Sequence, residues 1–168
     1  MTGIGYYAFD NCTSLSKVQL SNGLTKIGTS AFSDCENLTE ITIPDSVTEI
    51  GGGAFSSCTS LAKITVSPDN KNYVSVDGVL FTKNMSTMVA YPAGSKRSTY
   101  TVPDGVTQIG GSTFSGCTSL SKVQLSNALT KIGNSAFSGC TSLTEITIPD
   151  SVTEIGNYAF YYCKTLPR

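Results

Sequence analysis

The sequence predicts a repeat solenoid, a fold in which short coils of similar sequence stack along one axis. Six cysteines lie 23, 23, 59, 23 and 23 residues apart, and a phenylalanine precedes each of them by three residues. A leucine follows each cysteine by three residues, so every coil carries the same apolar positions. Such short units stack because one unit is too small to bury its apolar side alone.

A longer period lies over the short one. Residues 12–61 and 117–166 differ at only 11 of 50 positions, so a block of several repeats was duplicated. One unit is 13 residues longer than the others. We expect a single domain over residues 1–168, with regular repeats at 1–66 and 98–168 and a long irregular repeat at 67–97. Because both ends fall inside a repeat, we interpret the chain as a piece of a longer protein.

The unit that begins at Leu38 shows how each coil is expected to fold. Its opening, LTEITI, alternates apolar and polar residues, as does a short strand with one buried face. Pro44 and Asp45 then end the strand and turn the chain, and the glycines at 51–53 permit a tight bend. The equivalent stretches predict six parallel strands, near residues 18–20, 41–43, 64–66, 100–102, 123–125 and 146–148.

The motif LxxIxIPxxVTxIGxxAFxxC, repeated every 23 residues, resembles the BspA-like class of leucine-rich repeats. The resemblance covers almost the whole chain. It implies an α/β repeat solenoid with a parallel β-sheet on the concave face and short turns or helical or irregular segments on the convex face.

The resemblance also implies a function, since members of this class act in adhesion and binding at cell surfaces. The expected protein is a non-catalytic module, secreted or displayed on a cell surface, that contacts a host or extracellular-matrix protein. The alternative is a structural spacer or intracellular scaffold segment without a ligand of its own.

The cysteines form a column along the predicted stack, because each occupies the same point of its coil. The flanking Phe and Leu residues favour buried free thiols that pack as small hydrophobic groups. A disulfide between neighbours in the column is the alternative. The chain has no histidine, and its cysteines lie too far apart for a zinc site. We therefore expect no metal, no cofactor and no enzyme.

The bulk composition excludes several classes of partner. A net charge of −1 gives no electrostatic reason to expect nucleic acid. The chain contains no run of 18 apolar residues, so we expect no membrane insertion. Its first residues also lack the pattern of a signal peptide.

Polar side chains between the apolar strand positions are expected to point out of the concave face. One column of them consists of Lys17, Glu40, Lys63, Thr99, Lys122 and Glu145. Another, past the turn, consists of Lys26, Glu49, Gln108, Lys131 and Glu154. Alternating charges across neighbouring strands attract one another. The columns are therefore either a charged recognition strip or self-paired groups that fix the register and keep the protein soluble.

The long repeat supplies the other binding candidates. VLF at 79–81 and MVAY at 88–91 flank a polar turn, which predicts a β-hairpin that projects from the convex side or packs along it. The spacing of Tyr73, Val76, Leu80 and Phe81 matches that of Val47, Ile50, Ala54 and Phe55, so Phe81 is expected in the place of Phe55. Irregular units often mark contact surfaces, and aromatic residues and methionine are good anchors. The candidates are Tyr73, Phe81, Met85, Met88 and Tyr91. The alternative is that they form the core of the hairpin.

The first and last coils are rich in tyrosine. Their tyrosines are Tyr6, Tyr7, Tyr158, Tyr161 and Tyr162. They either anchor a partner or pack on neighbouring repeats. Since neither end carries a polar capping unit, we expect the isolated chain to associate end to end.

Overall fold

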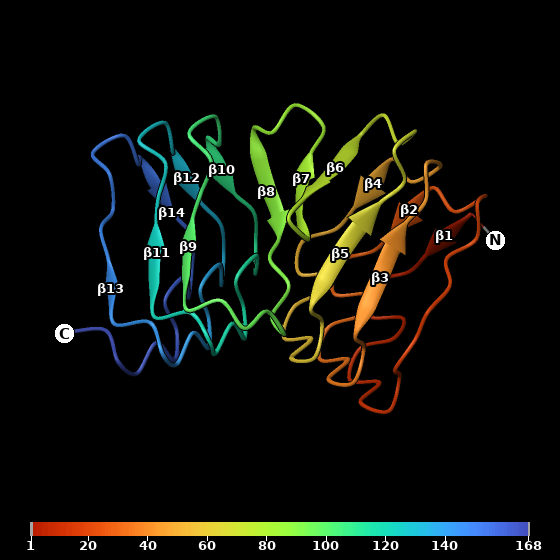
Figure 1. The fold of residues 1–168 in the computed structure, drawn as a ribbon, viewed down its shortest axis with the longest axis horizontal. Coiled ribbons are helices and arrows are strands. Elements are labelled where there is room, and N and C mark those ends of the chain that lie inside the picture. The colour runs from red at the N-terminus through yellow and green to blue at the C-terminus, as the bar shows by residue number, and fades with distance from the viewer. Residues whose placement is uncertain (1, 168) are drawn as a thin grey trace.

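The computed structural model describes residues 2–167, and within that range it consists of short strands and turns without any helix. The coils follow one another along the long axis, with the two chain ends at opposite ends of the molecule (Figure 1). The repeat solenoid is therefore confirmed, whereas the α/β class with helical segments is not.

The regular coils contribute strands on two sides of the solenoid, and most of them contribute one on each side. The primary strands, which carry the LxxIxI motif, are β3 (Glu40–Ile43), β5 (Lys63–Val66), β9 (Thr99–Thr101), β11 (Lys122–Gln124) and β13 (Glu145–Ile146). The secondary strands are β1 (Gly3–Ile4), β2 (Lys26–Ile27), β4 (Glu49–Ile50), β10 (Gln108–Ile109), β12 (Lys131–Ile132) and β14 (Glu154–Ile155). The long repeat adds β6 (Tyr73–Val76), β7 (Val79–Thr82) and β8 (Thr87–Ala90).

The primary strands confirm five of the six predicted strands, each within one or two residues. Residues 18–20 form no strand, so the sixth prediction was wrong. The primary strands also form two parallel sheets rather than one, with orders β3-β5 and β13-β11-β9. The break occurs at the long repeat, where the N–H of Ile64 in β5 donates to the carbonyl of Gly78 at 2.9 Å.

The secondary strands were not predicted. Residues of the column past the turn lie in parallel strands, where Lys26 pairs in register with Glu49, and Lys131 with Glu154. Two-residue strands carry too little alternation to be recognised in one coil. Their order, β1-β2-β4 at one end and β14-β12-β10-β8 at the other, continues along the stack.

The outer turns, which we define as residues 6–12, 29–35, 52–58, 111–117, 134–140 and 157–163, take the place of the expected helical segments. Their backbone N–H groups alternate between two kinds of partner. The N–H of Phe32 donates to Ala54 in the next coil at 2.8 Å, whereas that of Ser33 donates to Ser30 in the same turn at 3.2 Å. An α-helix needs consecutive N–H groups to bond four residues back, so this alternation excludes one.

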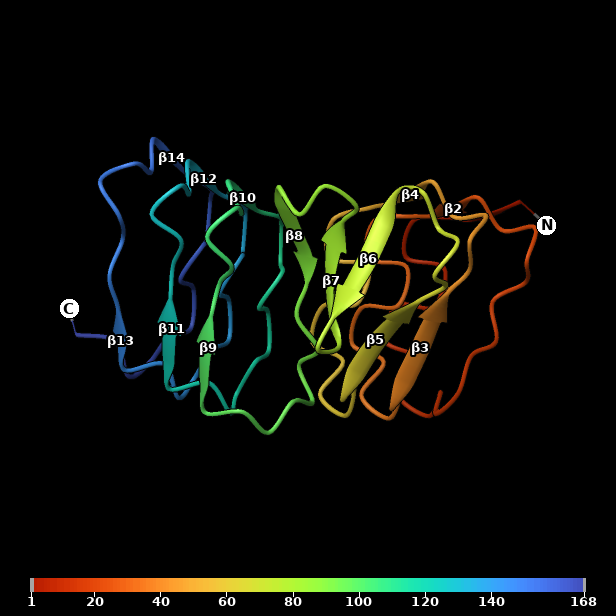
Figure 2. The same ribbon diagram turned by 45° about the horizontal axis from the view of Figure 1, so that its top comes forward.

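The long repeat folds as a three-stranded meander inside the stack. β6 pairs antiparallel with β7, and β7 pairs antiparallel with β8. Asp77 and Gly78 form the first turn with φ angles of 51° and 80°. A type I′ hairpin turn requires positive φ angles at both of its central residues. The predicted pairing of 79–81 with 88–91 is thus confirmed, but its place on the convex side was wrong. β6, β7 and β8 lie between β5 and β9 (Figure 2).

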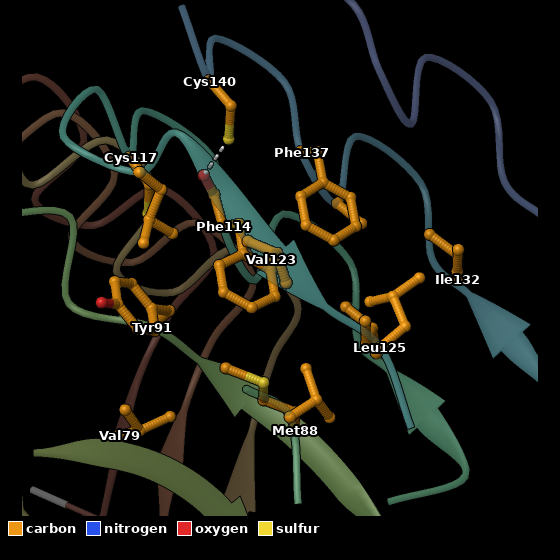
Figure 3. Packing of buried hydrophobic residues seen from close by; sticks show 14 of the residues in the cluster. Val79, Met88, Tyr91, Phe114, Cys117, Val123, Leu125, Ile132, Phe137 and Cys140 are labelled. Atoms are coloured by element: carbon orange, nitrogen blue, oxygen red, sulfur yellow. Dashed lines mark hydrogen bonds between the residues drawn. The ribbon is translucent and has the colours of Figure 1, made fainter. Parts of the chain in front are cut away.

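The meander separates two hydrophobic cores. Val79, Phe81 and Met88 belong to the C-terminal core, while Leu80 and Ala90 belong to the N-terminal core. Neighbouring residues of a strand point to opposite faces, so β7 contributes to both cores. In β8, Met88 and Ala90 are two residues apart and still lie in different cores, because the pairing of β7 with β8 shifts register between Leu80 and Phe81. Figure 3 shows Val79 and Met88 on the C-terminal side, close to the stacked rings of that core.

Tyr91, and not Phe81, continues the column of phenylalanines. Its N–H donates to Thr113 of the next coil at 2.9 Å, and its ring lies 5.1 Å from that of Phe114. Phe114 and Phe137 continue the stack at 4.7 Å (Figure 3). The alignment of Phe81 with Phe55 was wrong because ten of the 13 extra residues lie before, and not after, the aromatic residue that packs on Phe114.

Candidate functional site

The charged column of the primary strands is paired within itself. Lys63 lies 3.4 Å from Glu40, and Lys122 lies 3.3 Å from Glu145. All four side chains are more than half exposed. Lys17 is exposed too, in the segment that forms no strand. Exposed pairs of this kind contribute about 0–1 kcal/mol each, so they guide register more than they stabilise the fold.

The secondary strands carry a second set of ion pairs. Lys26 contacts Glu49 at 2.8 Å, and Lys131 contacts Glu154 at 2.8 Å. The hydrogen bond and the charge of Glu49 raise the pKa of Lys26. Each predicted column therefore contains two Lys–Glu pairs between neighbouring coils, which is the arrangement of the self-paired alternative.

Two equivalent grooves lie over the primary strands, one at each end of the solenoid. The N-terminal groove has a volume of about 630 Å³ and the C-terminal groove about 350 Å³. Nine lining positions of one recur in the other, 105 residues later. These pairs are Lys17/Lys122, Val18/Val123, Gln19/Gln124, Leu20/Leu125, Asn22/Asn127, Glu40/Glu145, Ile41/Ile146, Thr42/Thr147 and Pro44/Pro149.

The grooves differ in volume, and they also differ in the pairing of the segment that opens each of them. In the C-terminal groove β11 pairs with β13, so Lys122 is in register with Glu145. The equivalent residues Lys17 and Glu40 are not joined by strand pairing in the N-terminal groove. β11 is held on its other edge by β9, whereas no described strand lies beyond residues 17–20. Four of the five predicted concave residues thus line the grooves, and Lys63 lies beside Glu40.

The aromatic candidates of the long repeat lie inside the protein. Tyr73, Phe81, Met88 and Tyr91 are at most 8% exposed, and only Met85 is half-buried. Their positions match the alternative in which these residues form a core. The Tyr73 hydroxyl accepts the N–H of Ile50 at 2.9 Å, so this side chain covers the free edge of β4. Burial raises the pKa of Tyr73 and that of Tyr91.

The six cysteines are free thiols in one column. Four of them donate to the carbonyl of the phenylalanine that lies 26 residues earlier, at 3.0–3.1 Å. Burial raises the pKa of Cys35 to about 11 and the pKa of Cys58 and Cys140 to about 12. The dashed line in Figure 3 marks the bond from Cys140 to Phe114. Cys35, Cys58 and Cys140 are therefore protonated packing groups at neutral pH.

Residues 2–167 contain no group of three or more His, Cys, Asp or Glu residues that is arranged to hold a metal ion. Over the same range no helix has the length and apolarity that crossing a membrane requires.

The repeat pattern matches a known family over its full length. The BspA type leucine rich repeat region matches residues 1–97 and 89–168, with six copies in the family description. The chain belongs to the BspA type leucine-rich repeat family. Among curated protein sequences, none matches this BspA type chain.

Solved structures of bacterial leucine-rich repeat proteins share the fold of this BspA type solenoid. A leucine-rich repeat protein from Eubacterium ventriosum is 30% identical over 98% of this chain and 56% of its own, with a TM-score of 0.75. The pneumococcal vaccine antigen PcpA is 27% identical over 93% of this chain and 50% of its own, with a TM-score of 0.77. A leucine rich cell surface protein from Faecalibacterium prausnitzii is 28% identical over 99% of this chain and 56% of its own, with a TM-score of 0.70.

This BspA type chain thus spans about half the length of these relatives.

Sequence reasoning found the polar columns but missed the grooves that they line. The signal that was available is the 105-residue duplication, which repeats Asn22 as Asn127 and Pro44 as Pro149. It also missed β6, although Asp77-Gly78 between YVSV and VLFT is a strong hairpin signal.

Proposed function

We propose that the chain is a non-catalytic protein-binding module of adhesion type, secreted or displayed on a cell surface. Its partner is an extracellular or host protein that lies along the primary strands and enters both grooves. The observation that carries this proposal is the pair of grooves, whose nine shared residue types come from the duplicated block.

The chemistry of the grooves suits a polar protein surface. Each combines the amides of a Gln and an Asn with the hydroxyl of a Thr, beside one Lys and one Glu. Neither contains an aromatic residue, so a flat stacking ligand has no platform in them. Two sites with nine lining residue types in common also favour a partner with a repeated or extended surface, since simultaneous contact strengthens binding beyond either site.

The spacer alternative rests on a different observation, namely that both charged columns pair within the protein. Charges that already have partners add little to recognition. The two functions therefore differ in whether uncharged groove residues, such as the glutamines, contact anything.

The test replaces one glutamine in each groove. Gln19→Arg and Gln124→Arg each fill a groove from an exposed position. Gln108→Arg in β10 is the matched control, since it makes the same exposed change among the secondary strands. The chain and its variants are immobilised and measured against collagen, fibronectin, laminin and intact host cells by surface plasmon resonance or cell adhesion.

We expect each groove variant to weaken binding to the partner that is found by about tenfold, which corresponds to about 1.4 kcal/mol. The double variant is expected to weaken it further, and Gln108→Arg to leave it unchanged. An equal loss with Gln108→Arg would refute the grooves as the contact. No binding to any of these surfaces by the folded chain would favour the spacer.

A further inference from the structure

The two ends of the solenoid carry almost all of its exposed large hydrophobic residues. Of eight such residues in the described chain, seven lie in the first and last coils, and only Val76 lies elsewhere. The seven are Tyr6, Tyr7, Phe9, Ile155, Tyr158, Tyr161 and Tyr162. Isolated exposed apolar residues are ordinary, but patches confined to two faces mark contact surfaces.

The first and last coils also have matching sequences and backbones. Residues 2–12 and 153–163 are identical at seven of eleven positions. Each outer turn has positive φ angles at two residues four apart, 57° and 58° at Tyr7 and Asn11, and 58° and 59° at Tyr158 and Tyr162. The internal turns also have two positive φ angles at residues four apart, as at Ser30 with 53° and Asp34 with 56°. Both end turns therefore have the shape that stacks inside the protein.

The hydrogen bonds that join internal coils show what each end lacks. In the last internal contact the N–H groups of Ser135, Phe137 and Gly139 donate to the carbonyls of the next turn at 2.7–2.8 Å. The equivalent donors at the C-terminal end are the N–H groups of Tyr158, Phe160 and Tyr162. The equivalent acceptors at the N-terminal end are the carbonyls of Tyr6, Ala8 and Asp10. No hydrogen bond within residues 2–167 uses any of these six groups.

Two further groups complete the match. Gly28 donates its N–H to Ile4 at 2.9 Å, as Gly156 does to Ile132 at 2.8 Å. The next members of that series are the N–H of Gly5 and the carbonyl of Ile155. Similarly, the thiol of Cys35 donates to the carbonyl of Phe9 in the preceding coil at 3.1 Å, and the next member of that series is the thiol of Cys12.

Of these residues, Gly5 gives the clearest indication that a coil can stack before the first one. A Cβ at the equivalent Gly28, Gly51, Gly133 or Gly156 would lie only 2.3–2.7 Å from backbone of the preceding coil, so those positions require glycine. A Cβ at Gly5 would meet nothing within 4 Å, and its φ is not in the left-handed region. The first coil thus carries the glycine that is needed for a coil stacked before it.

We propose that a second copy of this chain occupies that place, so that β14 of one copy pairs with β1 of the next and their outer turns join. Each unused donor of one end then faces the equivalent unused acceptor of the other, in the register already present within the chain. Glu154 would lie beside Gly3, an uncharged neighbour, so no like charges meet. Such a contact is head-to-tail, and it extends the stack without closing a ring.

The strands that would pair at the junction, β14 and β1, have two residues each. The contact is therefore small, and we expect reversible, concentration-dependent association.

Sedimentation velocity of the 168-residue chain, with reductant, from about 1 µM to about 1 mM tests the proposal. We expect the weight-average mass to exceed twice the 17.6 kDa of one chain at the upper end, without a plateau at the dimer. Gly5→Ala should remain monomeric, because its Cβ would clash with the preceding copy. Gly105→Ala, at another exposed glycine whose Cβ meets nothing within 4 Å, should behave as the unchanged chain.

Two readouts make the test specific for the ends. Gly5→Ala keeps an intact C-terminal end, so a small amount mixed with the unchanged chain should shorten the assemblies. Cys12 and Cys163, which are only half-buried in the single chain, should become protected from iodoacetamide as association proceeds.

A mass of 17.6 kDa at all concentrations would overturn the proposal and leave the two ends for other partners. A stable dimer would overturn it as well, and so would association of Gly5→Ala equal to that of the unchanged chain. Equal circular dichroism and equal urea unfolding of the two glycine variants show that both are folded.

Discussion

Asn70 is the polar residue on which the start of the long repeat depends most. Its side chain is 0% exposed and makes four hydrogen bonds. Nδ2 donates to the carbonyls of Pro44 at 2.7 Å and Val47 at 3.0 Å in the preceding coil. Oδ1 accepts the N–H groups of Asn72 and Tyr73, each at 2.8 Å. The amide thus ties the first residue of β6 to the turn beneath it.

Replacing Asn70 by alanine removes all four bonds and leaves backbone groups without partners. Removing one partner from a buried hydrogen bond costs about 1–3 kcal/mol for each group left unpaired. Water that enters the small cavity satisfies part of them. We therefore expect Asn70→Ala to lower the free energy of unfolding by about 4 kcal/mol, at the lower end of the sum for four groups.

The measurement is urea unfolding, followed by far-ultraviolet circular dichroism. Asn72→Ala is the matched control, since that side chain is exposed two residues away and makes no hydrogen bond in residues 2–167. We expect the control to change the free energy of unfolding by less than about 0.5 kcal/mol. A cost for Asn70→Ala below about 1 kcal/mol, or no larger than that of the control, would refute the reasoning.

Two other predictions concern the cores and the thiols. Leu80→Ala in the meander should lower the free energy of unfolding by about 2–5 kcal/mol, because a fully buried leucine is truncated. Val76→Ala, at a position that is 41% exposed, should lower it much less. Equal losses for the two variants in urea unfolding would contradict a buried meander. The thiols of Cys58 and Cys140 have their pKa raised from 9.0 to about 12 by burial, so they stabilise the fold below pH 9 and lose that contribution as the pH rises to about 12. Unfolding at pH 7 and at pH 10 should therefore show a loss of up to about 1.4 kcal/mol per pH unit for each thiol above pH 9, and the loss should be smaller in a double variant with alanine at both positions.

The regular coils could be predicted because each local feature recurs at one period. Phe32 and Phe137 occupy the same point of their coils, and so do Cys35 and Cys140, so any error of assignment in one coil is corrected by the others. The parallel pairing of β3 with β5 and of β11 with β13 follows from that repetition. The charge pairs follow too, since residues 23 apart lie side by side.

The long repeat has no second copy in the chain with which it can be compared, and several predictions for it were therefore wrong. The long repeat has one position in the column of phenylalanines, and two of its aromatic residues, Phe81 and Tyr91, are candidates for that position. Local spacing favoured the first, whereas stacking on Phe114 selects the second. The residues predicted to anchor a partner are large apolar side chains in an irregular unit. Such residues are equally suited to a core, and only contacts distant in sequence decide between the two.

The sequence by itself determined the period, the stacked coils, the columns of Phe and Cys and the family. Each of these depends on comparing one repeat with another, which the printed sequence permits. The tertiary structure decided the second set of strands, the meander between two cores and the grooves over the primary strands. The meander depends on how the coils before and after the long repeat close around residues that have no equivalent elsewhere in the chain. The secondary strands and the grooves depend on contacts between neighbouring coils, which the pattern within one coil does not reveal.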